Sequence, residues 1–114
     1  MSNDEILNIV FKLSNEVNYE VDINNIVTII HAQNHWIQNF FRKLKFKIPL
    51  SKKITLDEYS SFVFLQIDGN RTVEDIGYNL ELNYGDKAHP LYERLLLFLN
   101  HIEVNCHYIE KLNL

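Results

Sequence analysis

The chain has 114 residues, of which 46% are hydrophobic and 23% are charged, and its formal net charge is −4. This length predicts a single domain, residues 1–114, with one hydrophobic core, because domains typically hold about 100–200 residues. The negative charge disfavours general nucleic-acid binding, and the single cysteine, Cys106, excludes an intramolecular disulfide. The polar N-terminus does not resemble a signal peptide, and no apolar run approaches the ~20 residues of a membrane span. We therefore expect a cytoplasmic protein with no membrane partner.

The N-terminal part of the chain predicts a β-hairpin. Residues 1–16 fit a helical and a strand pattern equally well, and both alternatives stay open. Apolar and polar residues alternate from Val17 to Ile23, and Asn24-Asn25 then offers a turn before a β-rich run that ends at His31. This second run is apolar on both faces, so we expect its strand to be covered on both sides.

A helix and a third strand are expected next. Asn34 caps an amphipathic helix that runs to about Lys45 and carries cations in its last turn, where the helix dipole favours them. The basic residues at 42–47 are interpreted as this helix end rather than as a nucleic-acid site, because the whole chain is acidic. Residues 52–56 predict a short strand whose lysines keep an open sheet edge soluble.

Two capped helices follow, separated by an Asp-Gly break. Asp57 caps the first helix, and Gly69 supplies the positive φ that a helix C-terminus commonly needs. Thr72 caps the second helix with Asp75 three residues later, as in a capping box, and the small Gly77 lies on its buried side. Gly85 is expected to end this helix.

A third helix is expected from Pro90 to Ile102, with Asn105 as its C-cap. Residues 106–110 are expected to form a strand or an extended wing. Two helices joined by a tight break and followed by a third are the outline of a helix-turn-helix, which becomes a winged helix once a small sheet is attached.

Catalytic and metal chemistry find little support in this sequence. His31 and His35 lie four residues apart, but no carboxylate or cysteine nearby completes a zinc ligand set. Cys106 and His107 are adjacent, and neighbours on an extended strand point to opposite faces, so the imidazole is not expected to activate the thiol. Phosphate-binding and nucleophile-elbow motifs are absent. We expect neither an enzyme nor a bound cofactor or metal.

Three segments of the chain occur in an order that is specific in combination. They are Leu56-Asp57-Glu58, the run Ile67-Asp68-Gly69-Asn70-Arg71-Thr72-Val73-Glu74-Asp75-Ile76, and Pro90-Leu91-Tyr92-Glu93-Arg94-Leu95. In these segments the chain resembles the PqqD family, the stand-alone form of the recognition element in pathways that modify ribosomally made peptides (RiPP recognition element). The resemblance covers residues 46–111.

The resemblance implies an α+β, winged helix-turn-helix-like fold. A small three-stranded antiparallel sheet packs on three helices, here with an extra helix between the second and third strands. It also implies a non-catalytic peptide chaperone, without a cofactor, that binds the leader of a precursor peptide and presents it to a radical S-adenosylmethionine (SAM) enzyme, as in pyrroloquinoline quinone (PQQ) biosynthesis. In the family the leader adds as a strand beside the third strand and contacts the third helix. The corresponding peptide-binding residues here are Lys53, Ile54, Thr55 and Leu56 on the strand and Leu91, Tyr92 and Leu95 on the helix.

Two alternatives to the adaptor stay open. One is a winged-helix regulator that binds DNA or another protein as a homodimer, and the other is a purely structural subunit. DNA recognition would need polar side chains on the third helix to read base edges, and this helix offers only Arg94, Asn100 and His101. The sequence therefore favours the peptide-binding adaptor.

Overall fold

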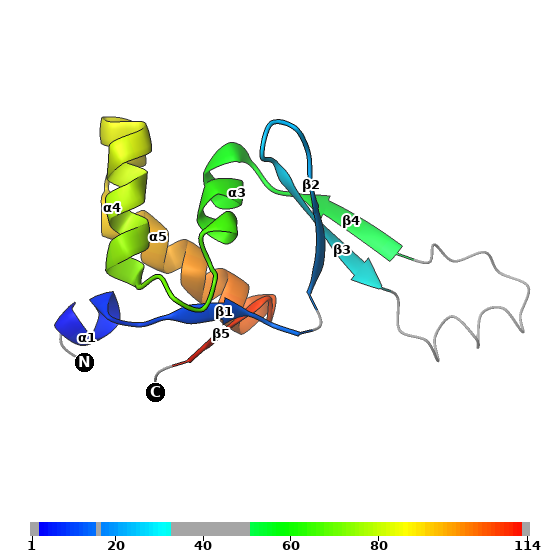
Figure 1. Cartoon of the computed structure of the whole chain (residues 1–114), viewed down its shortest axis with the longest axis horizontal. Coiled ribbons are helices and arrows are strands. Elements are labelled where there is room, and N and C mark those ends of the chain that lie inside the picture. Colours follow the sequence, from blue (N-terminus) through cyan, green and yellow to red (C-terminus); the bar gives the residue numbers. More distant parts are fainter. Residues whose placement is uncertain (1–2, 16, 33–50, 113–114) are drawn as a thin grey trace, which may run out of the picture.

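The computed structural model describes residues 3–15, 17–32 and 51–112 of the chain and shows a small α+β fold (Figure 1). One sheet has the strand order β2-β3-β4, and a separate two-stranded ribbon pairs β1 with β5. The strands are β1 (Phe11–Leu13), β2 (Asn18–Val21), β3 (Val27–Ala32), β4 (Ser51–Thr55) and β5 (Ile109–Lys111). The helices are α1 (Asn3–Leu7), α3 (Glu58–Leu65), α4 (Val73–Tyr84) and α5 (Leu91–Asn100), with a 3-10 turn η1 (Gly85–Ala88) and a π-helical turn η2 (His101–Asn105). The predicted α+β class with an antiparallel sheet is confirmed, whereas the winged-helix assignment stays a prediction.

The ambiguous N-terminal segment contains both a helix and a strand. Helix α1 ends at Leu7, and strand β1 then pairs antiparallel with β5, so that Lys12 lies opposite Glu110. The Lys12 Nζ and Glu110 Oε1 atoms are 2.9 Å apart. The predicted C-terminal extension is thus a strand, and its partner comes from the opposite end of the chain.

The predicted hairpin is confirmed as β2 and β3. Its turn is held by Asp22, whose Oδ1 accepts hydrogen bonds from Asn24 N at 2.8 Å and from Ile26 N at 3.0 Å. Asn25 adopts a positive φ of 62°, which asparagine tolerates better than most residues. The expectation that β3 is covered on both faces is wrong for one face. Val27 and Ile29 are buried against the helices, but residues 28 and 30 on the other face stay partly exposed.

Helix α3 begins as expected and ends earlier than expected. The Asp57 side chain accepts a hydrogen bond from Ser60 N at 2.7 Å, which confirms the N-cap. The helix ends at Leu65 with Gln66 as its C-cap, so Gly69 is not the helix terminus. Gly69 has the predicted positive φ, 80°, but it serves the following turn, where its N–H donates to Phe11 O at 3.0 Å. The predicted helix between residues 34 and 45 lies outside the described residues.

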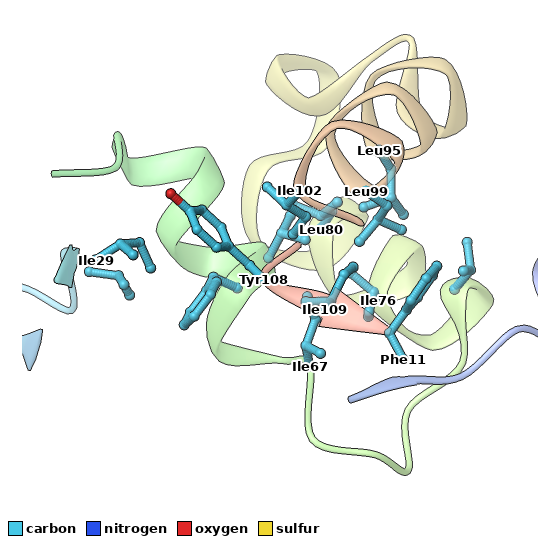
Figure 2. Close-up of a cluster of buried hydrophobic side chains, with 14 of the residues drawn as sticks. Phe11, Ile29, Ile67, Ile76, Leu80, Leu95, Leu99, Ile102, Tyr108 and Ile109 are labelled. Carbon is cyan, nitrogen blue, oxygen red and sulfur yellow. The ribbon is translucent and has the colours of Figure 1, made fainter. Parts of the chain in front are cut away.

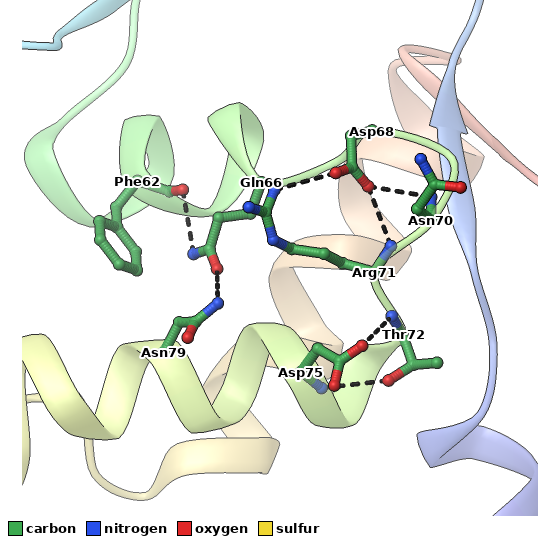
Figure 3. Close-up of polar contacts among 8 residues, drawn as sticks. All are labelled: Phe62, Gln66, Asp68, Asn70, Arg71, Thr72, Asp75 and Asn79. Carbon is green, nitrogen blue, oxygen red and sulfur yellow. Dashed lines mark hydrogen bonds and ion pairs between the residues drawn. The ribbon is translucent and has the colours of Figure 1, made fainter.

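The turn between α3 and α4 is fixed by its own side chains (Figure 3). Asp68 Oδ1 accepts hydrogen bonds from Arg71 N and Asn70 N, each at 2.9 Å, and these bonds lower the pKa of the Asp68 carboxyl. Thr72 and Asp75 form a complete capping box at the start of α4, as predicted. These contacts fix the turn locally, and Gly69 N and Val73 N add hydrogen bonds to Phe11 O and Ile9 O of the N-terminal segment.

Helices α4 and α5 approach each other at Gly77. A Cβ added to this glycine would lie 2.6 Å from Tyr92 Cε1, so the close approach predicted from the sequence is confirmed. Gly85 ends α4 with a φ of 53°, also as predicted. The third helix departs from its expected course, because α5 ends at Asn100 and continues as the π-helical turn η2, after which Cys106 rather than Asn105 is the C-cap.

One cluster of buried side chains joins the ribbon, the sheet and the helices (Figure 2). Phe11 and Ile109 enter it from the ribbon, Ile29 from the sheet, and Leu80 and Leu95 from α4 and α5. Burying such aliphatic and aromatic side chains typically contributes about 1.5–3 kcal/mol each. No helix in the described ranges is both long and apolar enough to cross a membrane.

Candidate functional site

Strand β4, which the sequence predicts as a binding edge, lies at one side of the three-stranded sheet (Figure 1). Leu56 N donates to Val27 O at 2.8 Å, and the register then places Ile54 opposite Ile29 and Lys53 opposite Ile30. Hydrogen-bonded and non-hydrogen-bonded pairs alternate along an antiparallel ladder. Ile54 therefore bonds to β3, whereas the backbone N–H and C=O groups of Lys53 and Thr55 point away from it. Within the described ranges no strand pairs with this outer side of β4.

The two faces of β4 differ in character. Ile54 lies opposite the buried Ile29 and therefore on the core face, yet 36% of its side chain is exposed. Thr55 lies on the other face, where its Oγ1 is 3.1 Å from Thr28 Oγ1. Lys53 shares this polar face, and its Nζ is 3.8 Å from Glu20 Oε1. A strand added at this edge would meet an apolar surface on one face and a cation on the other.

The predicted helix residues do not lie together at this edge. Leu95 is fully buried in the core, so its predicted contact with a peptide would require α5 to move and stays a prediction. The Tyr92 ring rests on Gly77 and lines a cavity of about 220 Å³ with Ile6 and Leu7 of α1, which places it on the α1 side of α5. Leu91 is partly buried at the start of α5 and stays a candidate.

Tyr59 lies in the first turn of α3, shortly after β4, and packs against α5, a contact that sequence reasoning missed. Its ring centroid lies 6.4 Å from that of Phe98, and Arg94 Cζ lies 4.4 Å from the Tyr59 centroid in a cation–π contact. Arg94 and Phe98 follow Leu91 at the helical spacing i+3 and i+7, which is the signal that could have identified this face of α5. Arg94 Nη1 also donates to Lys87 O at 2.6 Å, so this guanidinium is engaged inside the molecule instead of projecting toward a nucleic acid.

The Tyr59 hydroxyl has an unusual environment. Its oxygen is buried and lacks a hydrogen-bond partner, and no other buried side-chain polar atom in the described part of the chain is in this state. Burial raises the pKa of Tyr59, and the nearby Arg94 partly opposes this rise. A buried hydroxyl without a partner destabilises the fold, and a ligand that accepts its proton in a hydrogen bond would remove that penalty.

The second group of reactive side chains lies around Tyr108. Its hydroxyl is 2.6 Å from His31 Nε2, and both residues line a cavity of about 390 Å³ together with Cys106 and His107. Cys106 Sγ lies 3.5 Å from His101 Nε2, so His101 is an imidazole within hydrogen-bond distance of this thiol. In the described ranges no three His, Cys, Asp or Glu side chains lie close enough to hold a metal ion. His35 and the basic residues at 42–47 lie outside these ranges.

The outer side of β4 thus offers outward-facing backbone groups that fit the predicted strand addition. Comparisons of the chain with protein-family models, with curated proteins and with solved structures found no match. The resemblance to the PqqD family therefore rests on the three sequence segments quoted above.

Proposed function

We propose that the protein is a non-catalytic adaptor that binds the leader of a ribosomally made precursor peptide and presents it to a radical SAM enzyme in the cytoplasm. The leader adds to β4 as a fourth strand of the sheet. The observation that carries this proposal is the outward direction of the backbone groups of Lys53 and Thr55, since strand addition satisfies such groups. The winged-helix assignment and a role in PQQ biosynthesis belong to the same proposal.

The chemistry of the two faces of β4 defines the expected leader. Every second side chain of the added strand would lie on the face of Ile54, where an apolar residue gains most from burial. The alternate side chains would lie on the face of Lys53, where an acidic residue is favoured. We therefore expect the bound segment to alternate apolar and acidic residues over three to five positions.

The test is a titration of the isotopically labelled protein with a synthetic leader from the precursor gene nearest to its own gene. We expect saturable shifts in the backbone amides of residues 53–56. Thr55→Pro removes one outward N–H and should weaken binding about tenfold, the equivalent of one hydrogen bond. Helical content measured by circular dichroism should be retained, because the Thr55 N–H does not bond to β3.

Thr55→Val is the matched control for this substitution. It removes the same side-chain hydroxyl, which contacts Thr28, but keeps the backbone N–H. Its affinity for the leader should stay close to that of the wild type. The adaptor proposal fails if residues 53–56 do not shift, or if the proline and valine variants bind equally well. Binding of duplex DNA with a steep salt dependence would instead support a regulator.

A further inference from the structure

A second concave surface lies away from the β4 edge and is lined by residues of the β2–β3 hairpin, of α3 (Figure 1) and of the C-terminal end of α4. It encloses about 450 Å³. Its lining includes Asn24, Asn25, Glu58, Phe62, Asn83 and Tyr84, none of which belongs to β4. We call these six residues the hairpin pocket. A ligand could occupy it independently of a peptide at the sheet edge.

The one charged group among the described residues that line the hairpin pocket is the Glu58 carboxylate. The Asn83 side-chain amide donates to Asn79 O at 2.9 Å, which leaves its carbonyl oxygen available. Gln66 at the same pocket donates to Phe62 O at 3.3 Å and accepts from Asn79 Nδ2 at 2.7 Å, so both of its polar atoms are engaged (Figure 3). Glu58 adds a carboxylate that accepts from the Tyr84 hydroxyl at 3.4 Å. A ligand that complements this carboxylate carries a positive charge and hydrogen-bond donors.

Charge and aromatic surface make a cationic donor the best match. No lysine or arginine in the described ranges forms an ion pair with Glu58, although other carboxylates of the molecule do have such partners. The rings of Phe62 and Tyr84 both line the pocket and meet edge to face with centroids 5.3 Å apart. Cations are attracted to the faces of aromatic rings. A guanidinium stacks on such rings and also forms bidentate hydrogen bonds with carboxylates.

We propose that the hairpin pocket binds an arginine side chain of a partner protein. The guanidinium pairs with the Glu58 carboxylate and stacks against Phe62 or Tyr84. A protein partner is favoured over a free amine because exposed apolar side chains flank the pocket. Ile23 at the hairpin tip is 97% exposed and Leu65 of α3 is 37% exposed, so residues next to the arginine would find apolar contacts there. This site goes beyond the leader-binding edge and gives the molecule a second interaction surface.

The experiment is an NMR titration of the full-length protein with the capped peptide Ac-Gly-Arg-Gly-NH2. Saturable shifts are expected in the side-chain amide of Asn83 and in the backbone amides of Asn24 and Asn25, with Lys53 and Thr55 unaffected. The same peptide with citrulline in place of arginine keeps the shape and loses the charge. Its affinity should be about tenfold lower, because hydrogen bonds between charged groups are roughly twice as strong as neutral ones.

Glu58→Gln tests the carboxylate directly and should also lower the affinity for the arginine peptide about tenfold. Glu93→Gln is the matched control, since Glu93 is the acidic residue in the first turn of α5 as Glu58 is in the first turn of α3. It should leave binding unchanged. Any of three outcomes would overturn the proposal. The arginine and citrulline peptides bind equally well, Glu58→Gln leaves the affinity for the arginine peptide unchanged, or the shifts are confined to residues outside the hairpin pocket.

Discussion

Gly77 lies where α4 meets α5, and the Tyr92 ring occupies the space that a side chain at this position would fill. In an exposed helix, replacing glycine by alanine stabilises the protein by about 1 kcal/mol, because alanine loses less backbone entropy. Here the added methyl group would lie 2.6 Å from Tyr92 Cε1, well inside van der Waals contact. Packing between the two helices therefore overrides the intrinsic helix preference of the residue.

We predict that Gly77→Ala lowers the free energy of unfolding by about 1–2 kcal/mol, measured by urea denaturation. This value combines an overpacking cost of roughly 1–3 kcal/mol with the smaller gain in helix propensity. The same substitution in a Tyr92→Leu background should be neutral or stabilising, because leucine is too short to reach the new methyl group. A stabilising Gly77→Ala in the wild-type background would contradict this account.

Much of the residue-scale structure could be predicted from the sequence, because it depends on near neighbours. The caps at Asp57 and Thr72 each bond to a residue three positions later, and the positive φ of Asn25 follows from local turn chemistry. The positive φ predicted for Gly69 is confirmed, but its predicted position at the C-terminus of the helix is wrong. The helix before it ends at Leu65, since the following residues turn to let Gly69 N bond to Phe11 O, a contact with a distant segment.

At the scale of elements, the β1–β5 ribbon is joined to the three-stranded sheet through Tyr108, just before β5. Its backbone oxygen accepts from Ser14 N at 2.8 Å, and its hydroxyl is 2.6 Å from His31 Nε2 on β3. The ring itself is 6% exposed and belongs to the core (Figure 2). One residue thus couples the ribbon, the connection before β2 and the central strand.

We predict that Tyr108→Phe costs about 1 kcal/mol of unfolding free energy, because it removes one hydrogen bond and leaves a partly buried imidazole nitrogen of His31 without its partner. The ring remains, so core packing is retained. Tyr78→Phe is the control, because the Tyr78 side chain is 63% exposed and surface changes of this kind typically stay within about 0.5 kcal/mol. Equal stabilities of the two variants would show that the His31 contact contributes nothing.

The arrangement of the elements was harder to predict than the elements themselves. Strands β1 and β5 have three residues each, which is too short for a periodic pattern, and they pair across almost the whole chain. At the candidate site, residues 53–56 were predicted from the resemblance to the PqqD family and from the lysines at 52 and 53. It could not identify Tyr59, because the contact of that ring with Arg94 depends on how α3 packs against α5.

At the scale of the whole molecule, the tyrosines tie stability to pH. Burial raises the pKa of four of the six tyrosines, Tyr59, Tyr84, Tyr92 and Tyr108. A raised pKa means that the folded protein holds these protons more tightly than the unfolded chain does. Their contribution to stability is fully present below about pH 10, the pKa of an unfolded tyrosine, and is lost as the pH rises through the raised values.

We therefore predict that the free energy of unfolding is insensitive to these groups at neutral pH and falls steeply above about pH 10. Urea denaturation across this range, together with the absorbance change of tyrosinate, measures the effect. Tyr59→Phe should reduce the alkaline loss of stability, because it removes one ionising group with a raised pKa. At neutral pH it should leave stability unchanged or raise it, since the Tyr59 hydroxyl is buried without a partner.

Tyr108→Phe separates the two effects of a buried tyrosine. Like Tyr59→Phe, this substitution removes an ionising group, so the variant should lose less stability than the wild type above about pH 10. The Tyr108 hydroxyl bonds to His31 in the wild type, so the variant should also be less stable than the wild type at neutral pH. The two variants should thus differ at neutral pH and respond alike to alkali. If Tyr59→Phe instead destabilised the protein as much as Tyr108→Phe at neutral pH, the Tyr59 hydroxyl would already have a partner. The Tyr59 hydroxyl would then no longer support a ligand site next to this residue.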